Sequence, residues 1–154
     1  MVETRKQVAA EAWGAVLQVH AALVPELDRA LREATGLPLT WYDVLLELSG
    51  AESHRLTMGQ LGERVVLSRS RVSRVIDDLQ RADLVRREPH PEDARSSYAV
   101  LTAAGLARFR KAAPVYVAAI DESLSDLSTA ELKTVRAVLR RVLEGHASRS
   151  GRAR

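Results

Sequence analysis

Small and apolar residues recur every three or four positions along the first 34 residues of the chain. The positions that share this spacing are Ala9, Trp13, Val16, His20, Leu23, Leu27, Ala30 and Ala34. Such spacing predicts one long helix over 3–34 with an apolar seam along one side. Pro25 lies inside it, and because proline has no N–H and its ring meets the preceding turn, we expect a kink or a break there. Gly36 and Pro38 are typical of a helix end.

Three helix-start signals follow at short intervals. They are Thr40 with Asp43, Thr57 with Gln60, and Ser68. The second is a capping box, in which the threonine and glutamine side chains each satisfy a free backbone N–H. The signals predict helices over 40–49, 57–65 and 68–82, with only Val66 and Leu67 left for the turn between the last two. Two short helices joined so tightly form a helix-turn-helix.

The pattern then changes from helical to extended. Residues 85–88 and 97–101 form two short runs separated by prolines and acids, which predicts a hairpin with a long tip. A hairpin directly after a helix-turn-helix is a wing. Beyond it, Thr102 begins a long helical stretch, and a second capping box, Ser128 with Glu131, begins a last helix.

These elements predict a mostly α fold, a winged helix-turn-helix with a small β-hairpin wing and long terminal helices that form a dimerisation region. We expect an N-terminal dimerisation helix over 1–35, a DNA-binding module over 36–101, C-terminal dimerisation helices over 102–146 and a frayed basic tail over 147–154, together one compact subunit. The seams of the terminal helices have no partner in the small central module. We therefore expect them to bury each other, within one subunit and across the two-fold axis of a homodimer.

Composition narrows the classes of protein. The chain is 46% hydrophobic but only 4% aromatic, so its core is built mainly from Leu, Val and Ala, which suits helices. It has no cysteine, which excludes disulfides, zinc-thiolate sites and thiol-based redox sensing. The histidines are scattered singly, and we expect neither a metal site nor a cofactor.

The chain lacks the motifs of the common enzyme classes and of targeted proteins. We find no nucleophile elbow, Gly-rich phosphate loop or metal-ligand motif, so we expect no enzyme activity. The N-terminus has no signal-peptide apolar core, and we see no apolar run of 18 residues. We expect a soluble, cytoplasmic protein with no membrane partner.

Positive charge is concentrated rather than abundant. A net charge of +3 and a pI near 9.7 do not by themselves indicate a nucleic-acid partner, but positions 64–74 hold four arginines and no acid. The candidate DNA-contacting residues of the helix over 68–82 are Ser68, Arg69, Ser70, Arg71, Ser73 and Arg74. Arginine on such a helix can bond guanine in the major groove. The alternative, a solvated basic face, is disfavoured by the place of this helix, second in a tight pair and followed by a hairpin.

The wing carries a candidate contact of its own. Arg95 follows Asp93 by two residues at the hairpin tip, so in an extended strand both side chains leave on the same side. An arginine there can reach the narrow minor groove of A·T-rich DNA. Asp93 would hold the guanidinium of Arg95 or of a neighbouring arginine. The alternative is an ordinary surface ion pair.

With these motifs, residues 61–105 resemble the MarR family of bacterial regulators. The segments that carry the likeness are 67–74, 79–87, 93–96 and 101–105. The Asp-x-Arg wing followed by Leu-Thr-x-x-Gly is the most family-specific part. The resemblance implies that Arg95 is the minor-groove arginine, Asp93 its wing partner, and 68–74 the start of the recognition helix. Two features depart from the family pattern, namely Pro25 and the pair Ala82 and Asp83, where relatives often have a glycine.

The resemblance also implies an effector. Members of the family commonly bind a small aromatic or phenolic ligand between the dimerisation and DNA-reading parts. The candidate ligand-binding residues here are Trp13, His20, Trp41 and Tyr42. The alternative is that they are core aromatics and a seam histidine.

The pattern therefore predicts a sequence-specific regulator of transcription that binds double-stranded DNA. We expect a ligand-responsive repressor that acts as a homodimer on a palindromic operator. The alternative is a nonspecific architectural DNA-binding protein, which would use the same helix and wing without a preferred sequence.

Overall fold

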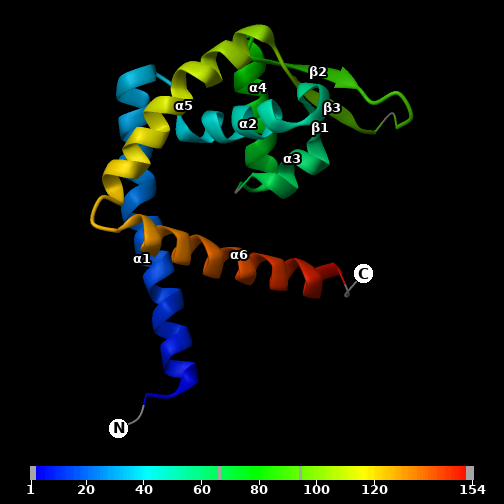
Figure 1. The fold of residues 1–154 in the computed structure, drawn as a ribbon. Helices are drawn as coiled ribbons and strands as arrows, with labels where there is room; N and C mark the ends of the chain where they lie inside the picture. Colours follow the sequence, from blue (N-terminus) through cyan, green and yellow to red (C-terminus); the bar gives the residue numbers. More distant parts are fainter. Residues whose placement is uncertain (1–2, 66, 94, 152–154) are drawn as a thin grey trace. The chain divides into compact units, whose positions relative to one another are not determined.

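A computed structural model describes residues 3–65, 67–93 and 95–151. The chain divides into two compact units, residues 1–119 and 120–154, each described here by itself. The elements in chain order are α1 (Arg5–Thr35), α2 (Leu39–Gly50), the 3-10 turn η1 (Glu52–His54), β1 (Arg55–Thr57), α3 (Met58–Arg64), α4 (Arg69–Arg81), β2 (Val85–Pro89), β3 (Ser97–Leu101), α5 (Ala103–Ser123) and α6 (Thr129–Gly151) (Figure 1). The predicted fold class, mostly α with a hairpin wing and long terminal helices, is confirmed.

Helix α1 covers nearly the whole of the predicted range, 3–34. A capping box between Thr4 and Gln7 begins it, and it continues through Pro25 to end at Gly36, whose φ of 69° is left-handed. The expected break at Pro25 is wrong. Proline removes only one backbone hydrogen bond, and the carbonyl deprived of that bond belongs to the exposed residue Ala21, where water can replace the donor.

The composition of α1 also corrects an expectation. Its most apolar window of 18 residues has a mean hydropathy of 1.2, so by length and composition alone the helix could cross a membrane. We had seen no such stretch in the sequence. A helix that packs on other helices passes the same test, and near the end of α1 the side chains of Leu27 and Leu31 are buried.

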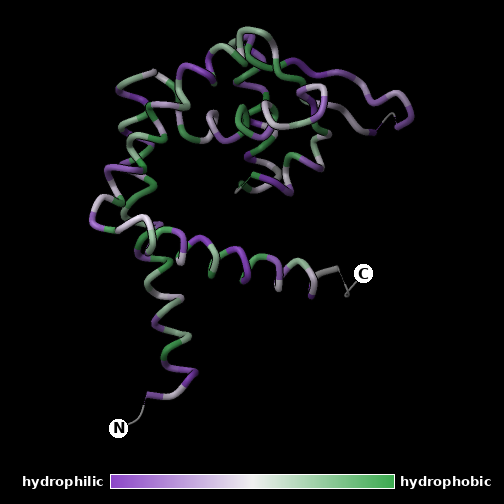
Figure 2. Tube along the Cα trace, viewed as in Figure 1, coloured by the Kyte–Doolittle hydropathy of each residue, from purple (hydrophilic) through white to green (hydrophobic). Residues whose placement is uncertain are grey.

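The core of the first unit lies between α2, α4 and the sheet. Its largest fully buried side chains are Leu31, Leu37, Val44, Leu45, Leu48, Leu61, Val72, Ile76, Leu79 and Val85. Tyr42 lies among them, with its ring centroid 5.4 Å from that of Phe109 and 4.6 Å from that of Tyr116. Leu and Val make up most of the buried core, which also includes Ala99 and Ala112, as the composition indicated. Figure 2 shows the contrast between this apolar centre and the hydrophilic wing.

The start of α2 is capped from another helix. Pro38 holds the N-cap position without a side-chain hydrogen bond, so the cap that we expected from Thr40 is wrong. Instead, Asp28 Oδ1 of α1 accepts a hydrogen bond of 2.7 Å from the Leu39 N–H, and its other oxygen accepts one of 2.7 Å from Arg32. Burial would raise the pKa of Asp28, but these hydrogen bonds and the charge of Arg32 outweigh it and lower the pKa.

The helix-turn-helix and wing follow the sequence closely. The capping box of α3 is present, with the Gln60 N–H donating to Thr57 Oγ1 at 3.1 Å and the Thr57 N–H donating to Gln60 Oε1 at 2.9 Å. Both predicted wing strands are confirmed, and they join β1 in an antiparallel sheet of order β1-β3-β2. Strand β1 was not predicted. Val66, expected in the turn, lies outside the described residues.

The beginning of α5 is tied to the turn after α4. The Thr102 N–H donates to the Leu84 carbonyl at 3.1 Å, Thr102 Oγ1 donates to the Asp83 carbonyl at 2.7 Å, and the Gly105 N–H donates to Thr102 Oγ1 at 2.9 Å. A Cβ on Gly105 would lie 2.0 Å from the Leu84 carbonyl oxygen, so only glycine fits. Asp83 has a φ of 59°, in the left-handed region that suits glycine.

Helix α6 forms most of the second unit. The predicted capping box begins it, with the Ser128 N–H donating to Glu131 Oε2 at 2.8 Å. The helix continues to Gly151, so the expectation of a frayed tail from residue 147 is wrong for 147–151, and residues 152–154 lie outside the described part. Hydrophobic and hydrophilic bands alternate along it (Figure 2). Its exposed apolar residues are Val135, Val138, Leu139, Val142 and Leu143.

Candidate nucleic-acid interface

The buried apolar side of α4 determines which residues of the helix are exposed to solvent. Val72, Val75, Ile76 and Leu79 are buried against the core, so the residues on the other side of the helix point outward. The backbone carbonyl of Ser68 accepts the first hydrogen bonds of the helix, from the N–H groups of Arg71 and Val72. The Ser68 hydroxyl makes no cap hydrogen bond. It lies 3.3 Å from the Ser70 hydroxyl, within hydrogen-bond distance, and both side chains are exposed.

The first turns of α4 present unpaired cations. Ser68, Ser70, Arg71 and Arg74 are exposed, whereas Ser73 is half-buried. Among the described side chains, neither Arg71 nor Arg74 lies within ion-pair distance of a carboxylate; the ion pairs found are Arg32–Asp28, Arg64–Glu47, Arg81–Asp78, Arg86–Glu88 and Arg87–Asp77. The structure does not describe the side chain of Arg69. The exposed guanidinium groups can donate to phosphate or to base edges without first breaking a contact within the protein.

The second half of α4 is fixed to the wing. Arg87 of β2 donates to Asp77 Oδ1 at 2.6 Å and to Ser73 Oγ at 3.4 Å. Near the end of the helix, Arg81 pairs with Asp78. Sequence reasoning missed Arg87, because Asp77 and Arg87 are ten residues apart and belong to different elements. This ion pair joins β2 of the wing to the second half of α4.

Backbone hydrogen bonds shape the tip of the wing. Asp93 Oδ1 accepts a hydrogen bond of 3.0 Å from the Arg95 N–H, and the Asp93 carbonyl accepts one of 2.9 Å from the Ser96 N–H. Asp93 thus holds the turn, whereas we had expected it to hold a guanidinium. The Arg95 side chain is exposed, and Ala94 lies outside the described residues. The turn therefore presents Arg95 to solvent.

The four candidate ligand-binding residues differ in burial. Trp13 is 62% exposed and His20 is also exposed, both on α1. Trp41 is half-buried at the edge of the core, and Tyr42 is packed inside it. For Tyr42 the arrangement favours the alternative of a core aromatic, and an effector site at these residues stays a prediction.

Asp43 is a titratable group that sequence reasoning treated only as part of a helix start. Burial, followed by the charge of Glu47 one turn away, raises its pKa from 3.8 to about 6. The same carboxylate contributes to the raised pKa of Tyr116, after the effect of burial. It lies on α2, next to Tyr42, whose ring packs against Phe109 and Tyr116 of α5.

Comparison with known proteins places this geometry in context. Residues 35–96 match the family model described as MarR family. The transcriptional regulator MhqR of Bacillus subtilis is 31% identical over 83 residues, which cover 54% of this chain and 57% of MhqR. The matched segment thus spans about half the length of the curated relatives.

Two solved structures match over nearly the whole chain. A MarR family transcriptional regulator of Streptomyces coelicolor, Sco3205, solved in complex with DNA, is 30% identical with a TM-score of 0.80, and the match covers 94% of this chain and 91% of that one. AbsC from the same organism, also a MarR family transcriptional regulator, is 32% identical with a TM-score of 0.78, and the match covers 96% and 99%.

Proposed function

The chain belongs to the MarR family, and we propose that it is a transcriptional regulator that binds a specific sequence of double-stranded DNA. The observation that carries the proposal is that Arg71 and Arg74, on the first turns of α4, are exposed and have no carboxylate within ion-pair distance among the described side chains, beside a wing that presents Arg95. A relative with the same fold was solved in complex with DNA. In this proposal α4 enters the major groove and the wing tip enters the adjacent minor groove.

The proposed contacts divide into base reading and shape reading. Arg74→Ala is expected to relax base preference, because a bidentate contact to guanine discriminates by about 1–3 kcal/mol. Arg95→Ala is expected to weaken binding with little change in preferred sequence outside the flanking minor groove. Arg110→Ala, on the exposed surface of α5, is the charge-matched control. Equal and sequence-independent losses for Arg74 and Arg95 would contradict this division.

One experiment separates a specific regulator from a nonspecific architectural protein. Random and genomic DNA, including the region upstream of the protein's own gene, is exposed to the protein at stated salt, and the bound sequences are read and footprinted. We expect an enriched palindrome with half-sites about one helical turn apart. Binding without a footprint, with a salt dependence set only by phosphate neutralisation, would support the architectural alternative.

A homodimer accounts for the exposed apolar residues of the terminal helices. Val8, Trp13, Val16, Leu17 and Val19 are exposed on α1, and five further Val and Leu residues are exposed on α6. Such a quantity of exposed apolar surface is unusual for a monomer and typical of an interface. Two copies related by a two-fold axis would present two recognition helices to a palindromic operator.

The proposed regulation is repression that a small aromatic or phenolic effector relieves. A ligand bound near Trp41, at the junction of α1 and α2, would change the spacing of the two recognition helices so that both half-sites cannot be engaged together. Trp41 fluorescence, in a Trp13→Phe background, reports binding of candidate phenols, and operator affinity is measured with and without them. Ligands that bind but leave operator affinity unchanged would refute this mechanism.

A further inference from the structure

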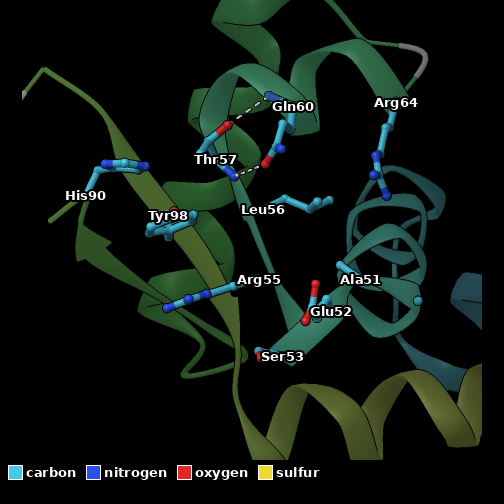
Figure 3. A pocket seen from close by; sticks show the side chains of 11 residues that line it. Ala51, Glu52, Ser53, Arg55, Leu56, Thr57, Gln60, Arg64, His90 and Tyr98 are labelled. Carbon is cyan, nitrogen blue, oxygen red and sulfur yellow. Dashed lines mark hydrogen bonds between the residues drawn. The ribbon is translucent and has the colours of Figure 1, made fainter. Parts of the chain in front are cut away.

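A cavity of about 510 Å³ lies between the wing and the first helix of the helix-turn-helix, and none of its lining residues belongs to α4. The end of α2, η1, β1, α3 and the wing all contribute to its walls (Figure 3). The lining side chains that matter here are Glu52, Arg55, Gln60, Arg64, His90 and Tyr98. Most of the lining is polar, which does not suit an apolar effector.

A stack of three side chains forms one wall of this cavity. The Arg55 guanidinium lies 4.8 Å from the centroid of the Tyr98 ring, and the His90 ring lies 4.9 Å from Tyr98 at an interplanar angle of 21°. Figure 3 shows Tyr98 between the other two. Because Arg55 of β1 pairs with Val100, two residues after Tyr98 on β3, the Arg55 and Tyr98 side chains share one face of the sheet. The aromatic ring holds the guanidinium in place and leaves its N–H donors available.

The cavity has more positive than negative charge. Two guanidinium groups, Arg55 and Arg64, line it together with one carboxylate, Glu52. Among the described residues Arg55 has no carboxylate within ion-pair distance, and Arg64 has only Glu47, at 3.9 Å. Gln60 uses Oε1 in the capping box, so its amide N–H groups remain as donors. These donors and charges suit an anion with several oxygen acceptors.

We propose that this cavity binds a backbone phosphate of the operator, with Arg55 as the main ligand and Arg64 and Gln60 as further donors. The inference rests on the proposed function. The start of α3 and the hairpin that carries Arg95 form walls of the cavity. If the wing tip enters the minor groove of a duplex, one strand of that duplex passes beside the cavity. Contacts of this kind fix the register of a protein on the duplex and carry no sequence information. The site would anchor the wing, while α4 reads the bases.

The test uses the full-length protein and the operator that the selection experiment yields. Arg55→Gln is expected to weaken binding about tenfold for every sequence and to make the slope of log K against log salt less steep by about 1. Replacing one phosphate at a time by an uncharged methylphosphonate should locate one position per half-site where the wild type loses affinity and Arg55→Gln does not. Arg110→Gln, which removes the same charge from exposed α5, should keep the wild-type slope and phosphate pattern.

The controls separate the failure of this inference from that of the proposed function. Arg55→Lys keeps the charge, and it should restore most of the salt slope if the residue binds phosphate rather than supports folding. A wild type without any operator would refute the proposed function. If the wild type binds an operator, and Arg55→Gln shows the same salt slope and the same pattern of methylphosphonate effects as the wild type, the cavity site alone is refuted. Loss of inorganic phosphate binding in Arg55→Gln with unchanged DNA binding would overturn the assignment to DNA and indicate a free phosphate compound.

Discussion

Asp43 is a half-buried carboxylate with no cation within ion-pair distance among the residues that the structure describes. Burial, and then the charge of Glu47, raise its pKa from 3.8 to about 6, so between these two values the folded protein holds a proton that the unfolded chain has released. In that range the unfolded state binds fewer protons, and the stability of the fold falls as the pH rises from about 4 to 6. Above pH 6 the full cost of the buried charge remains.

Asp43→Asn should therefore stabilise the protein above pH 6. The expected gain at pH 8 is about 1–2 kcal/mol, which is less than the full shift implies because solvent partly screens the group. Urea unfolding at pH 4.5 and pH 8 measures it, with the exposed Asp126→Asn as control. The same dependence of stability on pH in Asp43→Asn and the wild type would show that another group is responsible.

Gly105 is required by a close approach of two backbones. Gly105→Ala would place a methyl group 2.0 Å from the Leu84 carbonyl oxygen, and we expect a loss of about 2–4 kcal/mol in the free energy of unfolding. In the matched control Gly59→Ala on α3, the nearest atom lies at 3.9 Å, so this change should stabilise by about 0.5–1 kcal/mol. Thermal and urea unfolding of both variants check the prediction, and equal effects would contradict it.

At the scale of elements, α2 depends on a cap from α1. Asp28→Ala removes the acceptor of the Leu39 N–H, and we expect a loss of about 1–2 kcal/mol at neutral pH. Asp28→Asn keeps an acceptor and should retain most of the stability. Since the folded pKa of Asp28 is lowered, its contribution is present above the unfolded value and is lost as the pH falls through the folded one. Urea unfolding, measured at pH 7 and at acidic pH, tests both statements. An Asp28→Ala variant that is as stable as the wild type would refute the cap.

The elements that the sequence predicts best are those stabilised by interactions between residues close together in the sequence. The capping boxes at Thr57 and Ser128 use residues three apart, so the sequence shows them directly. The cap of α2 comes from Asp28, eleven residues before its partner, and the prediction of a cap from Thr40 is wrong because no local pattern reveals so distant an acceptor. Strand β1 has three residues and depends on pairing with distant β3. Such an element has no periodic pattern of its own.

The same reasoning applies to the candidate site. Helical periodicity sufficed to place Arg74 outward, because the buried Val72 and Ile76 determine the opposite side. The ion pair that joins the wing to α4 and the stack of Arg55 on Tyr98 could not be predicted, because each joins elements that only the folded chain brings together. Contacts between residues far apart in the sequence produce no regular residue spacing from which they could be predicted.

At the scale of the whole molecule, the exposed apolar residues of α6 predict a dimer. Replacing Leu139 and Val142 by Lys places charge at positions that are exposed in one chain and buried in the proposed interface. Sedimentation equilibrium should then show a monomer, and operator affinity should fall at least tenfold, because one half-site is bound alone. Arg140→Gln on the same helix is the control. A double variant that remains a dimer would exclude this surface from the interface.

The hydrogen bonds of Thr102 join the base of α5 to the turn after α4, so a tilt of α5 would reach α4 at this turn, which would then act as a pivot. Helix α4 has 13 residues and is about 20 Å long, so a rotation of about 10° at the pivot moves the opposite end, where Ser70 and Arg71 lie, by about 3 Å. The spacing of successive base pairs is about 3.4 Å. A small tilt of the base of α5 would thus be amplified along the length of α4 into a displacement of nearly one base pair.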